Sequence, residues 1–141
     1  MQAPIVLYDA DCGFCRWSLA KLLAWDRRGR LRAVALQDPR AEELLGGMGE
    51  EERMASWHLV GPDGEVRSAG AAFEPLLRLL PGGRPFAALA ARAPRPTARG
   101  YRWIADHRGA FGRLVTDGAR RRADARIDSR NMVSATRSTR R

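Results

Sequence analysis

The segment IVLYDADCGFC, Ile5–Cys15, holds the first expected strand and both cysteines of the chain. Its four apolar residues, Ile5–Tyr8, precede Asp-Ala-Asp, a pattern that favours a buried strand whose carboxyl end delivers side chains to a site. A helix is expected next, over about residues 13–28, because apolar residues recur there at helical spacing, namely Cys15, Leu19, Leu22 and Leu23. The two cysteines therefore fall at a strand-to-helix junction.

The rest of the pattern predicts an α/β fold. A second strand is expected over residues 30–38, and a hairpin over 57–60 and 65–68, where Gly61-Pro62-Asp63-Gly64 supplies the turn. Further helices are expected over about 41–45, 71–80, 85–92 and 101–114, and the stretches 46–52 and 93–100 are expected to be loops. A β-α-β unit followed by a hairpin and a helix predicts a small mixed sheet flanked by helices, with extra C-terminal helices.

The 141 residues fit one compact domain, expected over residues 1–115. Residues 116–141 contain eight arginines, three aspartates and no aromatic residue, so we expect an Arg-rich, disordered tail. The arginines Arg120–Arg122 can bind acidic surfaces weakly, but without aromatic residues for base stacking no specific nucleic-acid binding is expected.

The cellular compartment bears on the cysteines. No apolar run is long enough for a membrane span, and the N-terminal sequence does not have the pattern of a secretory signal, so a cytoplasmic protein is expected. Thiols are kept reduced in the cytoplasm, which favours a catalytic or metal-binding role for the close pair over a structural disulfide.

The spacing Cys-Gly-Phe-Cys suits thiol–disulfide exchange. The first turn of a helix stabilises negative charge, and residues three apart on a helix are neighbours, so Cys12 and Cys15 can form and break a disulfide without refolding. We expect Cys15 to be buried on the apolar face of the helix and to act as the resolving thiol. Cys12, at the mouth of the helix, is the expected attacking thiolate.

Neighbouring residues are expected to tune this pair. Phe14 can offer apolar surface to a partner, and Tyr8 can line the site or pack in the core. The carboxylates Asp9 and Asp11 disfavour a nearby thiolate, although a buried aspartate can instead relay a proton. Later in the chain, Tyr101 and Arg108 lie seven apart and are expected to share a helical face in a packing or ion-pair role.

Three alternatives remain open. A structural zinc site needs four ligands, and beyond the cysteines the chain has only His58 and His107, each interpreted as a hydrogen-bonded or surface histidine. The Asp9-x-Asp11 pattern looks like that of haloacid-dehalogenase-type phosphotransferases, but Lys21 is the only lysine and no later acidic pair closes a strand. The third alternative is a non-catalytic binding module whose CxxC is structural or holds zinc.

The segments YDADCGFC, SWHLVGPDGEVRSAGAAFEPLLRLLPG and YRWIADHRGAFGRL resemble, in order and spacing, the DCC-type thiol-disulfide oxidoreductases, over about residues 5–115. The resemblance implies a thioredoxin-like fold with a redox pair at Cys12 and Cys15, Asp9 and Asp11 as its motif partners, and no bound cofactor or metal. It implies protein or small-molecule thiols and disulfides as partners. Ala10 stands where the family usually has glycine, and the loop at 53–57 lacks the proline that thioredoxins place there.

Overall fold

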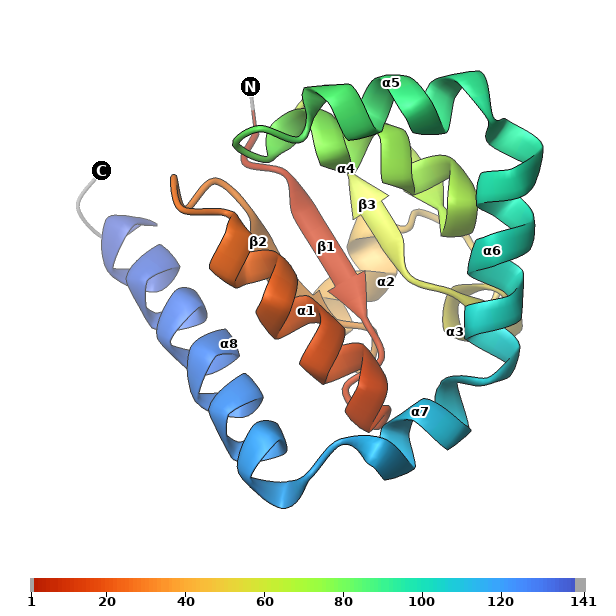
Figure 1. Cartoon of the computed structure of the whole chain (residues 1–141). Coiled ribbons are helices and arrows are strands. Elements are labelled where there is room, and N and C mark those ends of the chain that lie inside the picture. The colour runs from red at the N-terminus through yellow and green to blue at the C-terminus, as the bar shows by residue number, and fades with distance from the viewer. Residues whose placement is uncertain (1, 139–141) are drawn as a thin grey trace.

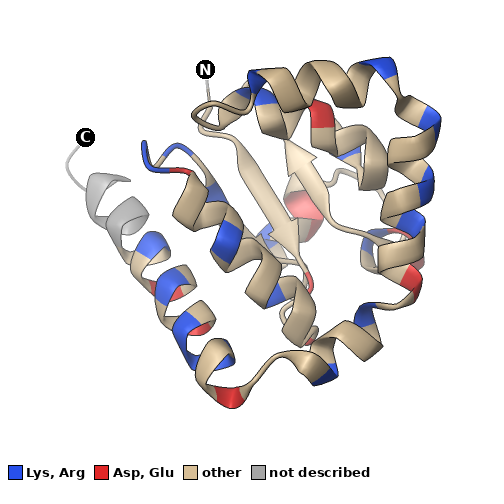
Figure 2. Cartoon of the chain, viewed as in Figure 1, with Lys and Arg blue, Asp and Glu red and all other residues tan. Residues whose placement is uncertain are grey.

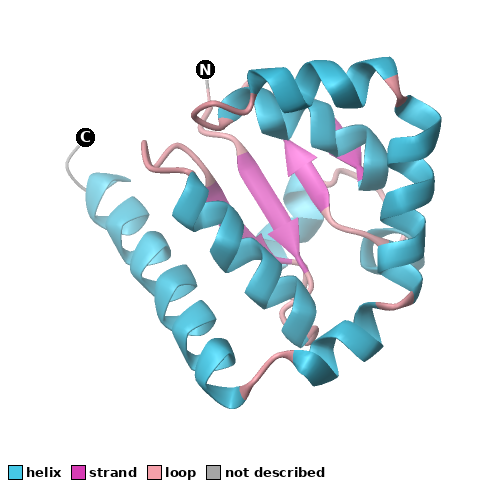
Figure 3. Cartoon of the chain, viewed as in Figure 1, coloured by secondary structure: helices cyan, strands magenta, loops and turns pink. Residues whose placement is uncertain are grey.

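The structure is a computed structural model that describes residues 2–138. Its sheet has the strand order β2–β1–β3–β4, formed by Arg32–Ala35, Ile5–Tyr8, His58–Val60 and Val66–Ser68 (Figure 3). Strand β1 is parallel to β2 and antiparallel to β3, with Leu7 opposite Val34 and His58, and β3 is antiparallel to β4. This topology confirms the predicted mixed sheet and is consistent with a thioredoxin-like fold.

Helices cover both faces of the sheet (Figure 1). On one face lie α1 (Gly13–Trp25), α4 (Phe73–Leu79) and α8 (Asp117–Ser138), which enclose a core that includes Val6, Leu19, Leu23, Leu59, Leu76 and Ile127. On the other face lie α2 (Pro39–Leu44) and α3 (Glu50–Ala55), over Leu7, Val34, Leu36, Ala41, Leu45 and Val60. The short β1 thus contributes alternate residues to two cores, as the side-chain period of a strand requires.

The remaining helices connect α4 to α8, from the amino end of β1 to its carboxyl end (Figure 1). After the 3₁₀ turn η1 (Ala69–Ala72) and α4, the chain forms α5 (Arg84–Arg92), α6 (Pro94–Asp106) and α7 (Arg108–Leu114). Figure 1 shows these three as an arc that ends beside the first turn of α1. From there α8 runs alongside α1 in the same direction, so a long part of the chain returns to the helix that bears the cysteines.

The expected loop 93–100 is wrong, because α6 begins at Pro94. Proline at the first helical position has no amide hydrogen to lose, and its fixed φ suits a helix start. The Thr97 hydroxyl donates to the Ala93 carbonyl at 2.8 Å within the same first turn. The expected single helix 101–114 is in fact two helices, which meet at His107.

Two shorter helices also differ from the expectation. The stretch 46–52, predicted to be a loop, contains the start of α3, whose first turn carries Glu50–Glu52 near the positive end of the helix dipole. Helix α1 ends at Trp25 rather than near residue 28, because Asp26 leaves helical geometry at ψ 66° and is completely buried. Its carboxylate accepts a hydrogen bond from the Leu31 amide at 2.8 Å, which fixes the turn into β2.

The predicted disorder of residues 116–141 is wrong for the described part, since Asp117–Ser138 forms helix α8. Ala123 and Ile127 are buried, and Ile127 joins the core beside Leu31 and Ala33. Two apolar residues spaced four apart were too weak a pattern to predict a packed helix from the sequence. Residues 139–141 lie outside the described residues.

Basic residues are spread over several helices, including α1, α5, α6 and α8, rather than gathered on one of them (Figure 2). Among the described residues, no helix is both long enough and apolar enough to cross a membrane.

Candidate active site

Cys12 forms the N-cap of α1. Its backbone is extended, with φ −92° and ψ 111°, and its Sγ accepts a hydrogen bond from the Cys15 amide at 3.3 Å. The capping sulfur therefore occupies the place where a serine or aspartate oxygen usually satisfies a free amide of the first turn. A thiolate at this position is held by a backbone donor and by the positive end of the helix dipole. Both cysteines are free thiols in the structure, and both are half-buried.

The surroundings of Cys15 disfavour its ionisation. Burial, then the hydrogen bond to Cys12 and the Cys12 charge, raise the pKa of the Cys15 thiol to about 12, and the nearby Asp9 charge acts in the same direction. The guanidinium of Arg108 opposes this shift. Cys15 was expected to be buried on the apolar face of the helix, and it is half-buried, because its side chain forms part of a cavity wall. The assignment of Cys12 as the attacking thiol and Cys15 as the resolving thiol stays a prediction.

The segment before Cys12 is held by Gln37, in the turn after β2. The Gln37 amide nitrogen donates to Asp9 Oδ1 at 2.8 Å and to Asp11 Oδ2 at 3.2 Å, while its oxygen accepts from the Ala10 amide at 3.1 Å. Asp9 Oδ1 also accepts from the Asp11 amide at 3.0 Å. One side chain therefore fixes the Asp-Ala-Asp turn. Because β1 and β2 are parallel, their carboxyl ends bring this glutamine and the two aspartates to the same edge.

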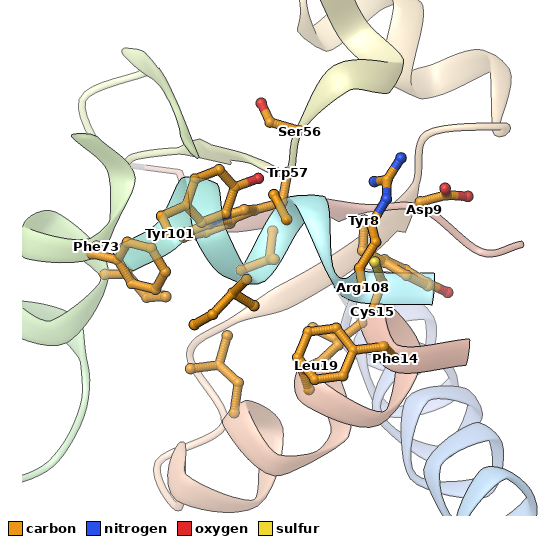
Figure 4. A pocket seen from close by; sticks show the side chains of 16 residues that line it. Tyr8, Asp9, Phe14, Cys15, Leu19, Ser56, Trp57, Phe73, Tyr101 and Arg108 are labelled. Carbon is orange, nitrogen blue, oxygen red and sulfur yellow. The ribbon is translucent and has the colours of Figure 1, made fainter. Parts of the chain in front are cut away.

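A cavity of about 320 Å³ lies next to Cys15, between α1, α4, α6 and the loop that enters β3 (Figure 4). Most of its wall is apolar, formed by Val6, Phe14, Leu19, Leu22, Trp57, Phe73, Leu76, Ile104 and Ala105. The polar part of the wall consists of Tyr8, Asp9, Ser18, Ser56, Tyr101 and Arg108. Figure 4 shows Cys15, Phe14 and Arg108 near one end, and Phe73 and Tyr101 near the other.

Several predicted residues meet at this cavity. Tyr8 and Asp9 lie on its wall, whereas Asp11 is exposed to solvent. Burial, and then the charge of Asp128, raise the pKa of the Tyr8 phenol. Phe14 also lies on this wall, and its ring packs on Phe111 of α7 with centroids 5.3 Å apart. The half-buried Phe14 thus joins the first turn of α1 to the arc of helices.

Four residues of the site were not predicted in their present roles. Gln37 and Ser56 were not singled out, and Tyr101 and Arg108 were expected on one helical face but lie on α6 and α7. Burial raises the pKa of the Tyr101 phenol, and Arg108 opposes that shift. The position of Gln37 directly after a strand parallel to β1 is a signal that could have identified it. Nothing local in the sequence identifies Arg108.

Both histidines make hydrogen-bond contacts with neighbouring residues. The buried His58 contacts the Ser68 hydroxyl through Nδ1 at 2.6 Å and the Arg53 carbonyl through Nε2 at 2.9 Å. His107 Nδ1 lies 2.7 Å from the Trp103 carbonyl. Across the described part of the chain, no group of three or more His, Cys, Asp or Glu side chains is placed to hold a metal ion. Lys21 lies over the ring of Trp17 at 5.5 Å, on an exposed part of α1.

The comparison with protein families agrees with this geometry. Residues 6–114 match the family model described as DCC1-like thiol-disulfide oxidoreductase, a span that runs from β1 to the end of α7 and leaves α8 outside. No curated protein and no solved structure matches the chain. The matched span includes the sheet, both cysteines and the cavity. The chain therefore belongs to the DCC1-like thiol-disulfide oxidoreductase family.

Proposed function

We propose that the protein exchanges thiols and disulfides through Cys12 and Cys15, with Cys12 as the nucleophile and Cys15 as the resolving thiol. The observation that carries this assignment is the N-cap. Cys12 Sγ accepts the Cys15 amide at 3.3 Å, so a negative charge on this sulfur meets a backbone donor at a helix start. Within residues 2–138 no backbone donor reaches the Cys15 sulfur, and its pKa is raised to about 12 by burial and by Cys12.

The reaction has two steps. In the first, the Cys12 thiolate attacks one sulfur of a substrate disulfide, a mixed disulfide forms, and the first substrate thiolate leaves and takes up a proton. In the second, Cys15 loses its proton and attacks the Cys12 sulfur, which forms the Cys12–Cys15 disulfide and releases the second substrate thiol. The substrate is reduced and the protein pair is oxidised by two electrons. A dithiol that reverses both steps regenerates the reduced protein.

Asp9 is the proposed proton acceptor for Cys15 in the second step. It lies on the same cavity wall as Cys15, and its charge contributes to the raised pKa of that thiol. A thiol that titrates at about 12 needs a nearby base to react at neutral pH. Gln37 fixes the carboxylate through the 2.8 Å hydrogen bond to Oδ1, so its direction is set before the reaction begins.

The test is an alkylation and mass-shift titration of the purified protein across thiol redox buffers, with total zinc assayed on the same sample. A reversible two-electron couple between roughly −270 and −120 mV, lost in both Cys12→Ser and Cys15→Ser, supports the proposal. The two variants also test the order of attack, since Cys15→Ser is expected to accumulate a mixed disulfide on Cys12 and Cys12→Ser is not. Thiols that stay locked, or about one zinc per chain, contradict exchange chemistry and favour a structural or zinc-binding CxxC.

Asp9→Asn gives a separate test of the relay. We expect about a 10²-fold or greater slowing of the second step at neutral pH, with little change in formation of the mixed disulfide. Rapid quenching with acid and mass spectrometry separates the two steps. The matched control is Asp11→Asn, because Asp11 shares the contact with Gln37 but is exposed and lies outside the cavity wall. Equal slowing of both steps by both variants would remove Asp9 from the relay.

A further inference from the structure

The cavity beside Cys15 has the dimensions and lining of a small-molecule site. Its volume of about 320 Å³ falls within the usual range for ligand pockets, and an apolar cavity of about 150 Å³ already accepts benzene. Cys15 is one of the residues that line the cavity, and Cys12 is not among them. A group seated in it therefore lies beside the redox pair without covering the attacking sulfur.

Arg108 gives the cavity a charge preference. In the described part of the chain, no hydrogen bond or ion pair engages its guanidinium, although it lies close enough to Cys15 and Tyr101 to shift their pKa values. By contrast, the acidic residue of the wall, Asp9, already accepts hydrogen bonds from Gln37 and from the Asp11 amide. The planar guanidinium of a half-buried arginine can donate two parallel hydrogen bonds to a carboxylate.

We propose that this cavity binds the non-sulfur part of a small-molecule thiol or disulfide, with an aromatic or branched aliphatic body in the cavity and a carboxylate on Arg108. The inference rests on the proposed function, because it places the substrate's sulfur at the cysteine pair. In the reaction the substrate disulfide gains two electrons and two protons and becomes two thiols, and Cys12 and Cys15 lose the same and become a disulfide. The remaining wall supplies apolar contact and excludes water.

Three disulfide probes separate charge from shape. Dithiobis(nitrobenzoate) is aromatic and anionic, dithiodipyridine is aromatic and neutral at neutral pH, and hydroxyethyl disulfide is small, polar and neutral. With the reduced protein, Arg108→Gln is expected to lower the second-order rate constant for the anionic probe about tenfold, and to leave both neutral probes nearly unchanged. Arg108→Lys keeps the charge and is expected to restore part of the loss.

Two further variants complete the test. Arg113→Gln removes an exposed arginine from the same helix, outside the cavity, and is expected to leave the three rates unchanged. Ala105→Phe fills the cavity from its wall and is expected to slow both aromatic probes but not hydroxyethyl disulfide. Equal slowing of all three probes by Arg108→Gln would mean that Arg108 acts only through Cys15 and does not bind the carboxylate. An effect of Arg113→Gln equal to that of Arg108→Gln would mean that the preference for the anionic probe comes from general surface charge. Either result overturns the proposal.

A binding measurement on a variant that cannot exchange disulfides distinguishes failure of the cavity assignment from failure of the proposed exchange activity. In the Cys12→Ser, Cys15→Ser double variant, nitrobenzoate is expected to quench tryptophan fluorescence saturably, since Trp57 lies on the wall. Arg108→Gln and Ala105→Phe are each expected to weaken that quenching. If no disulfide reacts with the native protein but nitrobenzoate still binds in this way, exchange fails and the cavity assignment stands. If the probes react but nitrobenzoate does not bind, the cavity assignment fails and exchange stands.

Discussion

Two ion pairs join α1 to α8, one near each end of the pair, and they differ in almost every property. Near the cysteines, Arg16 meets Asp124 at 3.2 Å, and both side chains remain partly exposed at 31% and 43%. At the far end, Arg130 meets Asp26 at 2.7 Å with 17% and 0% exposure. The same arginine also donates to the Leu23 and Asp26 carbonyls, at 2.7 and 3.2 Å. The far pair closes the carboxyl end of α1, whereas the partly exposed near pair contributes little to stability.

The carboxyl end of α1 is fixed by Arg130, whereas its amino end carries the reactive sulfur. The orphan carbonyls at the end of α1 are bound by an arginine more than a hundred residues away, so the helix is fixed where no chemistry takes place. At the other end, the side chain that caps the first turn, among the residues that the structure describes, is that of Cys12. A cap made by the reactive atom must be given up when a mixed disulfide forms. A firm far end allows that change without loss of the helix.

The strongest test of the contrast removes Arg130. Arg130→Ala leaves the Asp26 carboxylate buried without its partner, and one of its oxygens, Oδ1, already has no hydrogen bond. We expect a loss of about 3–5 kcal/mol in the free energy of unfolding, measured with urea. The control is Arg126→Ala, an exposed arginine of α8. A loss below that of the control variant would contradict the anchoring role of the buried pair.

The second test concerns the reactive end and pH. The pKa of Cys15 lies at about 12 against 9.0 for an ordinary cysteine, so in the folded protein its alkylation by iodoacetamide is expected to rise only well above pH 9.0. Since this thiol ionises first in the unfolded chain, the contribution of Cys15 to folding stability is expected to be constant below pH 9.0 and to be lost as pH rises from 9.0 towards 12. The protein in urea is the reference. Alkylation of Cys15 at the same pH in both states would contradict the burial of this thiol.

The third test measures the core that α8 supplies between the two pairs. Ile127 is 3% exposed and packs in the same cluster as Leu31 and Ala33. Ile127→Val removes one methylene group and is expected to cost about 0.5–1.5 kcal/mol in the free energy of unfolding. The matched exposed change on the same helix is Met132→Leu, expected to have almost no effect. A neutral Ile127→Val would mean that the helix does not contribute to the core in solution.

The smallest effect is expected at the exposed pair. Asp124→Asn keeps the size of the side chain and removes its charge, and the expected loss is about 0.2–1 kcal/mol, decreasing with added salt. Urea unfolding at low and high salt measures it. A loss as large as that of Arg130→Ala would erase the difference between the two ends of the helix pair.

Patterns a few residues long predicted β1, the start of α1 and the β3–β4 hairpin. The apolar run Ile5–Tyr8, the cysteine spacing and the Pro-Asp-Gly turn of the hairpin each act over a few residues, and the structure has a strand, a helix start and a hairpin at those places. The same local reasoning failed where proline is tolerated, because Pro94 can open a helix as well as break one. The cysteine assignment itself stays a prediction until it is measured.

What the sequence did not predict depends on contacts between distant residues. Gln37 reaches the aspartates only because β1 and β2 pair in parallel, and Arg108 reaches Cys15 only because the helix pattern breaks at His107. Helix α8 has little apolar periodicity of its own, and its Arg130 contacts Asp26, which follows the last residue of α1. Each of these depends on a partner that no short window of sequence contains.

The parallel course of α1 and α8 has a practical consequence. Strand β1 begins, and α8 finishes, at the end of the sheet that lies away from the cysteines (Figure 1). Helix α8 spans 22 residues, or about 33 Å at the usual rise. A chip, bead or fluorophore attached through either terminus therefore presents the thiols to the solution. Single-molecule pulling from the two termini would load the anchored end first and report the opening of the Asp26–Arg130 contact before any disturbance of the redox pair.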